Sequence, residues 1–173
     1  MQVHGLNSPP LRLPGAMPVW IAEATREQWT AVAQSAQSNK ARLVALWGTD
    51  RGASGHVVSV AYAFGEGLLW LRLPQASEER TYPDIATYFP CAARMQRVVF
   101  DLNGLSALEG RDQRPWFNHG PWPRNYHPLR HGATGQEVFD HPLEPYPYVR
   151  VSGEGVHEIA GGPRNAGTIE PGH

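Results

Sequence analysis

Prolines are crowded into the segment that follows residue 105, and this crowding limits which secondary structure the segment can form. Proline fixes φ, lacks a backbone donor and disfavours helix in the residue before it. Seven of the chain's 16 prolines lie between residues 106 and 150, interleaved with Trp and Tyr. The segment is therefore predicted to be an extended arm that its aromatic rings anchor to a folded body. The residues concerned are Pro115, Pro121, Pro123, Pro128, Pro142, Pro145, Pro147, Trp116, Trp122, Tyr126, Tyr146 and Tyr148.

Two helices are predicted before this arm. Thr25 and Gln28 have the spacing of a capping box, and the apolar period that follows predicts a helix over 25–38. A second helix is predicted over 90–103, ended by Gly104 as a left-handed cap. Its predicted apolar face consists of Ala92, Met95, Val98, Val99 and Leu102.

Three strands are predicted between the helices. Residues 41–47, 56–64 and 68–73 are rich in β-branched and aromatic side chains and are separated by glycine-containing turns. Short connections of this kind favour antiparallel neighbours in one sheet. The predicted fold class is α+β: a two-layer domain with a small, mostly antiparallel sheet and two main helices on one face, followed by the extended arm.

The same patterns divide the chain into four parts. Residues 1–17 hold few apolar side chains and several prolines, so we expect a flexible N-terminal arm. Residues 18–105 form the α+β core, and 106–152 the Pro/aromatic arm. Residues 153–173 have little apolar content, and we interpret them as the incomplete start of another domain.

Composition excludes several classes of function. The single cysteine, Cys91, rules out an internal disulfide and a four-cysteine iron–sulfur site, and we expect its side chain to be a small buried hydrophobe at the start of the second helix. A net charge of −1 with dispersed basic residues gives no footprint for nucleic acid. No apolar run reaches the length of a membrane span, so direct membrane insertion is not expected.

Two short motifs suggest chemistry that their surroundings disfavour. His127 and His131 have the i, i+4 spacing of a metal site and lie near His119 and His141, but Pro128 disfavours helix at His127. A small metalloenzyme with a histidine-held ion remains the less favoured alternative. Gly153-x-Gly155 resembles a dinucleotide motif, yet Glu158 occupies the place of the third glycine.

Several motifs occur in an order that is typical of one family. They are Ala92-Ala-Arg-Met-Gln-Arg-Val-Val-Phe-Asp-Leu-Asn-Gly104, Arg111-Asp-Gln-Arg-Pro-Trp-Phe-Asn-His119, Tyr126-His-Pro-Leu-Arg130 and Gly153-Glu-Gly-Val-His-Glu-Ile159. The chain thereby resembles the thirty-kilodalton-subunit domain of respiratory complex I and its relatives in the large subunits of group 4 NiFe hydrogenases, of the hydrogenase-4 or formate hydrogenlyase type. The resemblance rests on motifs over 82–173 and on pattern alone over 25–74.

The resemblance implies a non-catalytic docking module of a membrane-associated oxidoreductase complex. The implied partners are the hydrogenase catalytic large-subunit domain and the iron–sulfur small subunit, which would hold the NiFe centre and the iron–sulfur clusters, since no cofactor is expected in this chain. The implied location is cytoplasmic, on the inner face of the bacterial membrane. A dedicated thirty-kilodalton subunit of an NADH-quinone oxidoreductase is the alternative within the family. The expected interface residues are Arg114, Pro115, Trp116, His119, Trp122, Tyr126, His127 and Arg130.

Two further expectations concern single polar residues. By the resemblance, Glu170 matches a proton-transfer glutamate beside the nickel site, whereas Asn165 stands where the family usually has histidine and Arg164 where it commonly has an apolar residue. Taken alone, Glu170 is a solvated carboxylate in a tail. In the arm, Arg114, Arg130 and His119 are expected to form hydrogen bonds, with Asp101 or Asp112 among the partners, that fix the arm in place.

Overall fold

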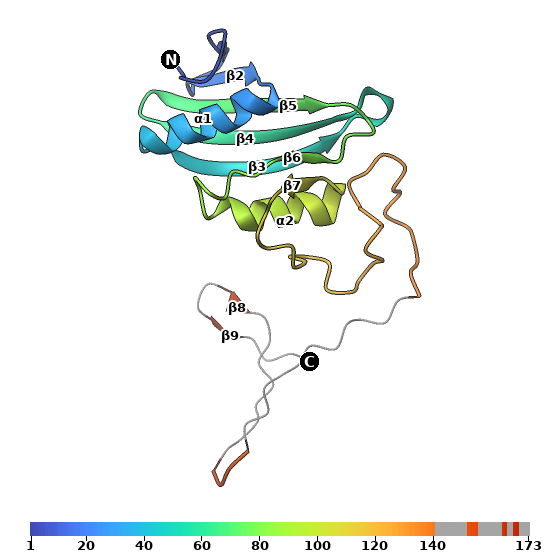
Figure 1. Cartoon of the computed structure of the whole chain (residues 1–173). Helices are drawn as coiled ribbons and strands as arrows, with labels where there is room; N and C mark the ends of the chain where they lie inside the picture. Colours follow the sequence, from blue (N-terminus) through green and yellow to red (C-terminus); the bar gives the residue numbers. More distant parts are fainter. Residues whose placement is uncertain (141–151, 156–163, 166–167, 170–173) are drawn as a thin grey trace.

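The computed structural model describes residues 1–140, 152–155, 164–165 and 168–169 (Figure 1). Its main feature is a five-stranded sheet with the strand order β1-β2-β5-β4-β3. The pairing of β2 with β5 is parallel, and the other neighbours are antiparallel. The strands are β1 (Leu11–Leu13), β2 (Val19–Glu23), β3 (Arg42–Asp50), β4 (His56–Phe64) and β5 (Gly67–Gln75).

The predicted α+β class with a mostly antiparallel sheet is confirmed. The three predicted strands are β3, β4 and β5, and the short helix η1 (Gly52–Ser54) lies in the turn between the first two. Sequence reasoning missed β1 and β2. The first of these lies inside the segment expected to be a flexible arm, where Met1, Val3 and Leu6 also pack against the core. A three-residue edge strand between prolines carries too little periodic pattern to be recognised.

Helix α1 (Arg26–Ser38) forms as predicted. The Thr25 hydroxyl accepts a bond from the Gln28 amide N–H at 3.3 Å, and the Gln28 side chain accepts one from the Thr25 N–H at 2.9 Å. This reciprocal capping box satisfies two backbone donors that the first turn leaves unpaired. The helix buries Trp29, Val32 and Ala33 completely.

Helix α2 (Ala92–Asn103) ends at Gly104, which adopts the expected left-handed conformation with φ 71°. Ala92 and Val99 are buried and Met95 packs on the core, but Leu102 is half-buried. The helix also buries three polar side chains, those of Gln96, Asp101 and Asn103. The expectation of a buried Cys91 is wrong: the residue precedes the first helical turn, and its side chain is exposed.

Both helices cover the same face of the sheet. The register places Val58, Val60 and Tyr62 of β4 opposite Leu73, Leu71 and Leu69 of β5, and all six side chains are buried in one cluster with residues of α1 and α2. Figure 1 shows α2 beside the small parallel pair β6 (Thr81–Pro83) and β7 (Ser106–Leu108). This arrangement leaves the outer surface of α2 available to the chain that follows β7.

Two short strands, β8 (Arg164–Asn165) and β9 (Thr168–Ile169), pair with each other near the C-terminal end. Glu170, His141 and residues 156–163 lie outside the described residues, so the expectations for them stay predictions. In the described part of the chain, no helix has the length and apolar character needed to cross a membrane.

Candidate functional site

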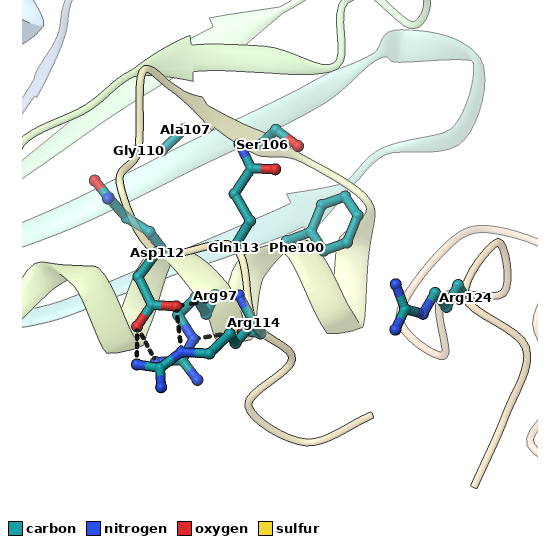
Figure 2. Close-up of a pocket in the computed structure, with 10 residues that line it drawn as sticks. Arg97, Phe100, Ser106, Ala107, Gly110, Asp112, Gln113, Arg114 and Arg124 are labelled. Atoms are coloured by element: carbon teal, nitrogen blue, oxygen red, sulfur yellow. Dashed lines mark hydrogen bonds and ion pairs between the residues drawn. The ribbon is translucent and has the colours of Figure 1, made fainter. Parts of the chain in front are cut away.

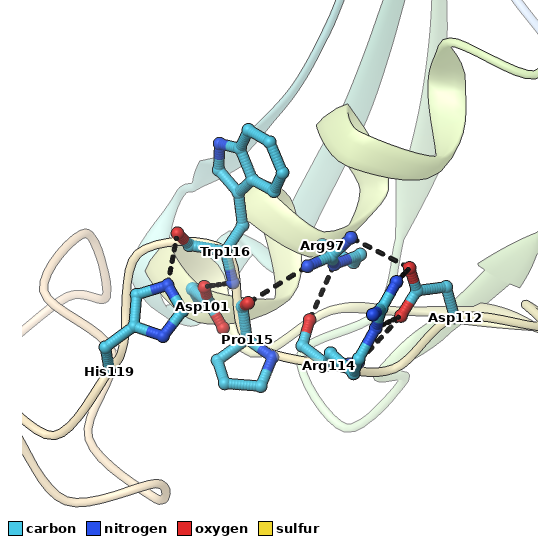
Figure 3. A network of polar contacts seen from close by, with 7 residues as sticks. All are labelled: Arg97, Asp101, Asp112, Arg114, Pro115, Trp116 and His119. Atoms are coloured by element: carbon cyan, nitrogen blue, oxygen red, sulfur yellow. Dashed lines mark hydrogen bonds and ion pairs between the residues drawn. The ribbon is translucent and has the colours of Figure 1, made fainter. Parts of the chain in front are cut away.

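The Pro/aromatic arm packs back on the outer surface of α2, and Asp101 is its first anchor (Figure 3). One oxygen of this buried carboxylate, Oδ2, accepts backbone N–H bonds from Trp116 at 2.7 Å, Phe117 at 2.7 Å and Asn118 at 3.2 Å. Hydrogen bonds to an ionised acceptor are stronger than neutral ones. Because one charge satisfies three consecutive donors, the backbone at 116–118 is held in a defined turn.

Arg97 is the second anchor. Its guanidinium donates to the backbone carbonyls of Arg114 at 2.6 Å and Pro115 at 3.0 Å, and to the Asp112 carboxylate at 2.9 Å. Arg114 also donates to Asp112 with two nitrogens, at 2.9 and 2.7 Å. These bonds and charges hold the pKa of the Asp112 carboxyl well below its usual range, Arg114 having the largest effect. The carboxylate is therefore ionised at any physiological pH.

The Trp116 ring is held by cations. The guanidinium carbons of Arg94 and Arg97 lie 5.4 and 5.0 Å from its ring centroid, within the range of cation–π attraction. His119 Nε2 lies 3.1 Å from the Trp116 carbonyl oxygen, so contacts hold both the ring and the backbone of this residue. The sequence-predicted residues Arg114, Pro115, Trp116 and His119 are thus brought together at one surface of α2 (Figure 3).

Farther along the arm, His127 packs at the end of α2. Its Nδ1 lies 3.2 Å from the Asp101 carbonyl oxygen and its ring meets Phe100 edge-on at 5.6 Å. A side chain on Gly104 would collide with the His127 ring, so the glycine is required both by its φ and by this contact. Two residues on, the Leu129 N–H donates to the Leu102 carbonyl at 2.9 Å.

The arm next reaches the β3–β4 turn, where Asp50 is its third anchor. One Asp50 oxygen accepts from the Gly52 N–H at 2.7 Å, and the other from the His131 N–H at 3.1 Å. The buried His56 faces this carboxylate at 3.8 Å and contacts Arg80 on its other nitrogen. Burial and the positive charge of Arg80 lower the pKa of His56, so its ring is neutral near pH 7.

Tyr126 closes a small loop in the last described part of the arm. Its hydroxyl donates to Glu137 at 2.7 Å, and the same carboxylate accepts the Thr134 N–H at 2.7 Å. These bonds, with the backbone bond the largest cause, lower the pKa of Glu137 to about 2. The ring of Tyr126 also meets Phe139 edge-on at 4.6 Å.

Several apolar side chains on this surface remain open to solvent. The exposed fractions are 40% for Phe100, 39% for Trp116, 49% for Phe117 and 56% for Leu129. Trp122 is half-buried instead, and its indole N–H is buried without a partner among the described residues. Apolar side chains grouped on a rigid surface are typical of contact sites for other proteins.

The three described histidines of the arm, His119, His127 and His131, do not gather into a metal site. His127 packs on Phe100 and His131 against Gly52 at the β3–β4 turn, while His119 faces the Trp116 carbonyl. In the parts of the chain that the structure describes, no group of three or more potential metal-ligating side chains occurs. Arg130 donates its backbone N–H to the His127 carbonyl at 3.1 Å, and it lines a surface hollow with Asp50 and His56.

Sequence reasoning missed Arg94, Arg97 and Phe117, whereas its expectation that Asp101 or Asp112 bonds to the arm is confirmed for both carboxylates. A signal for Asp101 was present, because a carboxylate in the last turn of a helix is repelled by the helix dipole. An acidic residue in the last turn of a helix therefore indicates that hydrogen-bond donors from another segment bind its carboxylate. No comparable signal marks Phe117, since its exposure depends on the turn that Asp101 fixes.

The core and most of the arm match a known protein family. Residues 22–138 match the family model described as the 30 Kd subunit of respiratory-chain NADH dehydrogenase. The chain is 29% identical over 140 residues to hydrogenase-4 component G of Escherichia coli (strain K12), covering 76% of this chain and 25% of that protein. It therefore spans about a quarter of the length of this relative.

A solved structure has the same fold. It is the membrane-bound sulfane sulfur reductase, an archaeal respiratory membrane complex, of which one chain superposes with a TM-score of 0.58 at 12% identity, covering 75% of this chain and 85% of that one. A trypsin-resistant fragment of Nqo5 also matches, with a TM-score of 0.49 at 16% identity, covering 54% of this chain and 82% of the fragment.

Proposed function

Since the chain belongs to the family of the 30 Kd subunit of respiratory-chain NADH dehydrogenase, we propose that it is a non-catalytic docking module of a complex I-related oxidoreductase. The likeness to hydrogenase-4 component G supports a group 4 NiFe hydrogenase of the hydrogenase-4 or formate hydrogenlyase type. Its partners would then be the catalytic large-subunit domain and the iron–sulfur small subunit, which would carry the NiFe centre and the clusters. Through them the module would sit on the inner face of the cytoplasmic membrane.

The observation that carries this proposal is the way the arm presents its aromatic side chains. Asp101 and Arg97 fix the backbone at 114–118, and Arg94 and Arg97 contact the Trp116 ring. The Trp116 ring and the Phe117 backbone are thus held in place, although the two residues remain 39% and 49% exposed. A fixed side chain loses little conformational entropy when a partner covers it. Aromatic and arginine side chains at such places commonly dominate binding energies at protein interfaces.

Co-expression with a hydrogenase catalytic domain and its iron–sulfur small subunit tests the proposal. The unchanged chain should co-purify with them. Phe117→Ala should weaken the complex by about 2 kcal/mol or more, the size of a hot-spot truncation, because the backbone bond to Asp101 is kept and the ring alone is lost. Trp116→Ala combined with Trp122→Ala should weaken it further.

Leu11→Ala is the matched control, since Leu11 is a 69% exposed apolar residue on β1, at the opposite edge of the sheet from β3. It should leave the complex unchanged. Equal recovery of the partners with Phe117→Ala and with Leu11→Ala would mean that the arm is not the docking surface.

A dedicated thirty-kilodalton subunit of an NADH-quinone oxidoreductase is the alternative within the family, and the description of the family model favours it. In that case the chain should form a complex with a quinone-reducing subunit and not with a hydrogenase catalytic domain. Parallel co-expression with both candidates distinguishes the two proposals.

The metalloenzyme alternative finds no support in the positions of His127 and His131, which pack against different parts of the core. We expect the purified chain to contain no stoichiometric nickel, iron or zinc. Elemental analysis giving about one metal per chain, lost in the variant with both histidines changed to Ala, would favour the enzyme instead.

A further inference from the structure

A groove lies between α2 and the chain that follows β7 (Figure 2). Its cavity volume is about 220 Å³. The ring of Phe100 forms part of its wall, and β7 together with the loop after it forms the facing wall. Residues on that side include Ser106, Ala107, Gly110 and Gln113.

The size of the groove suits a side chain better than a cofactor. Pockets for drug-sized ligands and cofactors usually measure about 300–1,000 Å³. The enclosed part beside Phe100 is smaller, and an open hollow of about 600 Å³, whose lining includes Arg111, Asp112, Gln113 and Arg114, continues it along the surface. A groove of this shape fits one inserted side chain with its neighbouring peptide.

The charges around the groove are unequal. Four arginines, Arg97, Arg111, Arg114 and Arg124, line the two hollows, together with a single carboxylate, Asp112. Two of these guanidinium groups already share Asp112, at 2.9 and 2.7 Å. Arg124 lines the other side of the groove (Figure 2). Excess positive charge beside the apolar Phe100 ring favours an anion that has an apolar neighbour.

We propose that this groove binds an acidic side chain of a protein partner, with an adjacent apolar side chain resting on Phe100. The proposal rests on the proposed docking function and adds the chemistry of the partner segment. Arg97 contributes to it as a fixed donor, because its bonds to the Arg114 and Pro115 carbonyls hold its guanidinium in place. A protein segment is favoured over nucleic acid because the other basic residues are dispersed along the chain and its net charge is −1, which gives no extended positive footprint.

Titration of the isotope-labelled full chain with a short peptide tests this site. The probe is Ac-Ser-Glu-Phe-Asp-Leu-Ser-amide, and its matched control is Ac-Ser-Gln-Phe-Asn-Leu-Ser-amide. The acidic peptide should shift the NMR signals of Gly110 and Gln113, and the control should bind at least tenfold more weakly. Raising NaCl to about 0.5 M should weaken the binding of the acidic peptide, since screening shortens the range of charge attraction. Equal binding of the two peptides would overturn the proposal.

Arg111→Glu is the test variant, and Arg12→Glu on β1 is its control, because both arginines are exposed and the second lies far from the groove in the sheet order. Arg111→Glu should lower the affinity for the acidic peptide at least tenfold, and Arg12→Glu should leave this affinity unchanged. An equal effect of both variants would mean attraction to the whole molecule and not to the groove. Tighter binding of inorganic phosphate or of single-stranded DNA than of the peptide, at the same signals, would also overturn the proposal.

The two proposals can fail separately. If the hydrogenase partners co-purify in a Phe117-dependent way while Arg111→Glu has no effect on either partner or peptide, the docking function stands and the acidic-segment site is wrong. If the peptide binds as expected but no partner is recovered, the site stands and the docking function is wrong.

Discussion

The sheet with its helices and the arm that packs on α2 are stabilised by different kinds of interaction. In the first, fully buried apolar side chains such as Trp29, Tyr62 and Leu71 form one cluster. In the second, three charged groups, Asp101, Arg97 and Asp50, bind the backbone of the arm while its aromatic rings stay partly exposed. Burial of apolar area is spread over many residues, whereas the arm depends on a few anchors. The arm should therefore be able to open while the sheet stays folded.

The largest expected effect lies in the core. Trp29→Ala should lower the free energy of unfolding by about 3–5 kcal/mol, since the ring is completely buried, meets Tyr82 edge-on and donates to the Pro83 carbonyl at 3.1 Å. Urea denaturation followed by circular dichroism measures this change. Leu11→Ala, at an exposed position, should leave the midpoint close to that of the parent chain. Equal midpoints for both variants would mean that α1 does not carry the core.

Asp101→Ala should affect the arm before the core. It leaves three backbone N–H groups without their acceptor, at roughly 1–3 kcal/mol for each donor that stays buried. Hydrogen exchange at Trp116, Phe117 and Asn118 should accelerate strongly, and trypsin should cleave faster after Arg124. Amides of β4 should exchange at the parent rate.

Asp101→Asn provides the matched variant, because its amide oxygen can still accept although it is neutral. Exchange at the same three amides should be intermediate between that of the parent and that of the alanine variant. Loss of β4 protection together with the arm would contradict the division of the molecule into two differently stabilised regions.

A smaller effect is expected at the start of α1. Thr25→Ala removes the side-chain half of the capping box and should cost about 1 kcal/mol of global stability. Thr25→Ser should retain most of it, because the hydroxyl acceptor remains. Denaturant midpoints of the two variants decide between this expectation and a cap that contributes nothing.

The smallest effect concerns the Tyr126–Glu137 pair and is a change of titration, not of global stability. The pKa of Glu137 is lowered to about 2, so its contacts are fully present above the ordinary glutamate pKa and are lost as the pH falls through about 2. The pKa of Tyr126 is raised, mainly by its bond to Glu137. The hydrogen bond is therefore present below the ordinary tyrosine pKa and is lost as the pH rises through the raised pKa of Tyr126. In an ultraviolet titration, Glu137→Gln should lower the pKa of Tyr126 relative to its pKa in the parent chain. An unchanged titration would mean that the bond does not form in solution.

Much of the fold could be predicted because its signals are local in sequence. The capping box at Thr25, the left-handed Gly104 and the apolar periods of β3, β4 and β5 all lie within a few residues of the elements they define. The burial of Gln96 was missed, because a helical period marks it as a surface position until a partner covers it, whereas Asp101 was expected as a hydrogen-bond partner of the arm.

The candidate site was predictable in composition but not in arrangement. Sequence alone placed Trp116, Trp122 and Tyr126 in an arm, yet in the structure Trp122 is partly buried and Phe117 is exposed. Whether a ring in a proline-rich segment faces a helix or solvent depends on where the backbone is held, and the holding groups lie elsewhere in the chain.

The amino-acid sequence by itself determined the helices, the three long strands and the family. The tertiary structure decided the pairing of β1 and β2 with the sheet, the three anchors of the arm and the groove beside Phe100. The physical reason is the distance along the chain. Caps and periods join residues three or four apart, whereas Asp101 meets a backbone 15–17 residues later and Asp50 one 81 residues later. Contacts of that span exist only after the core has brought their elements together.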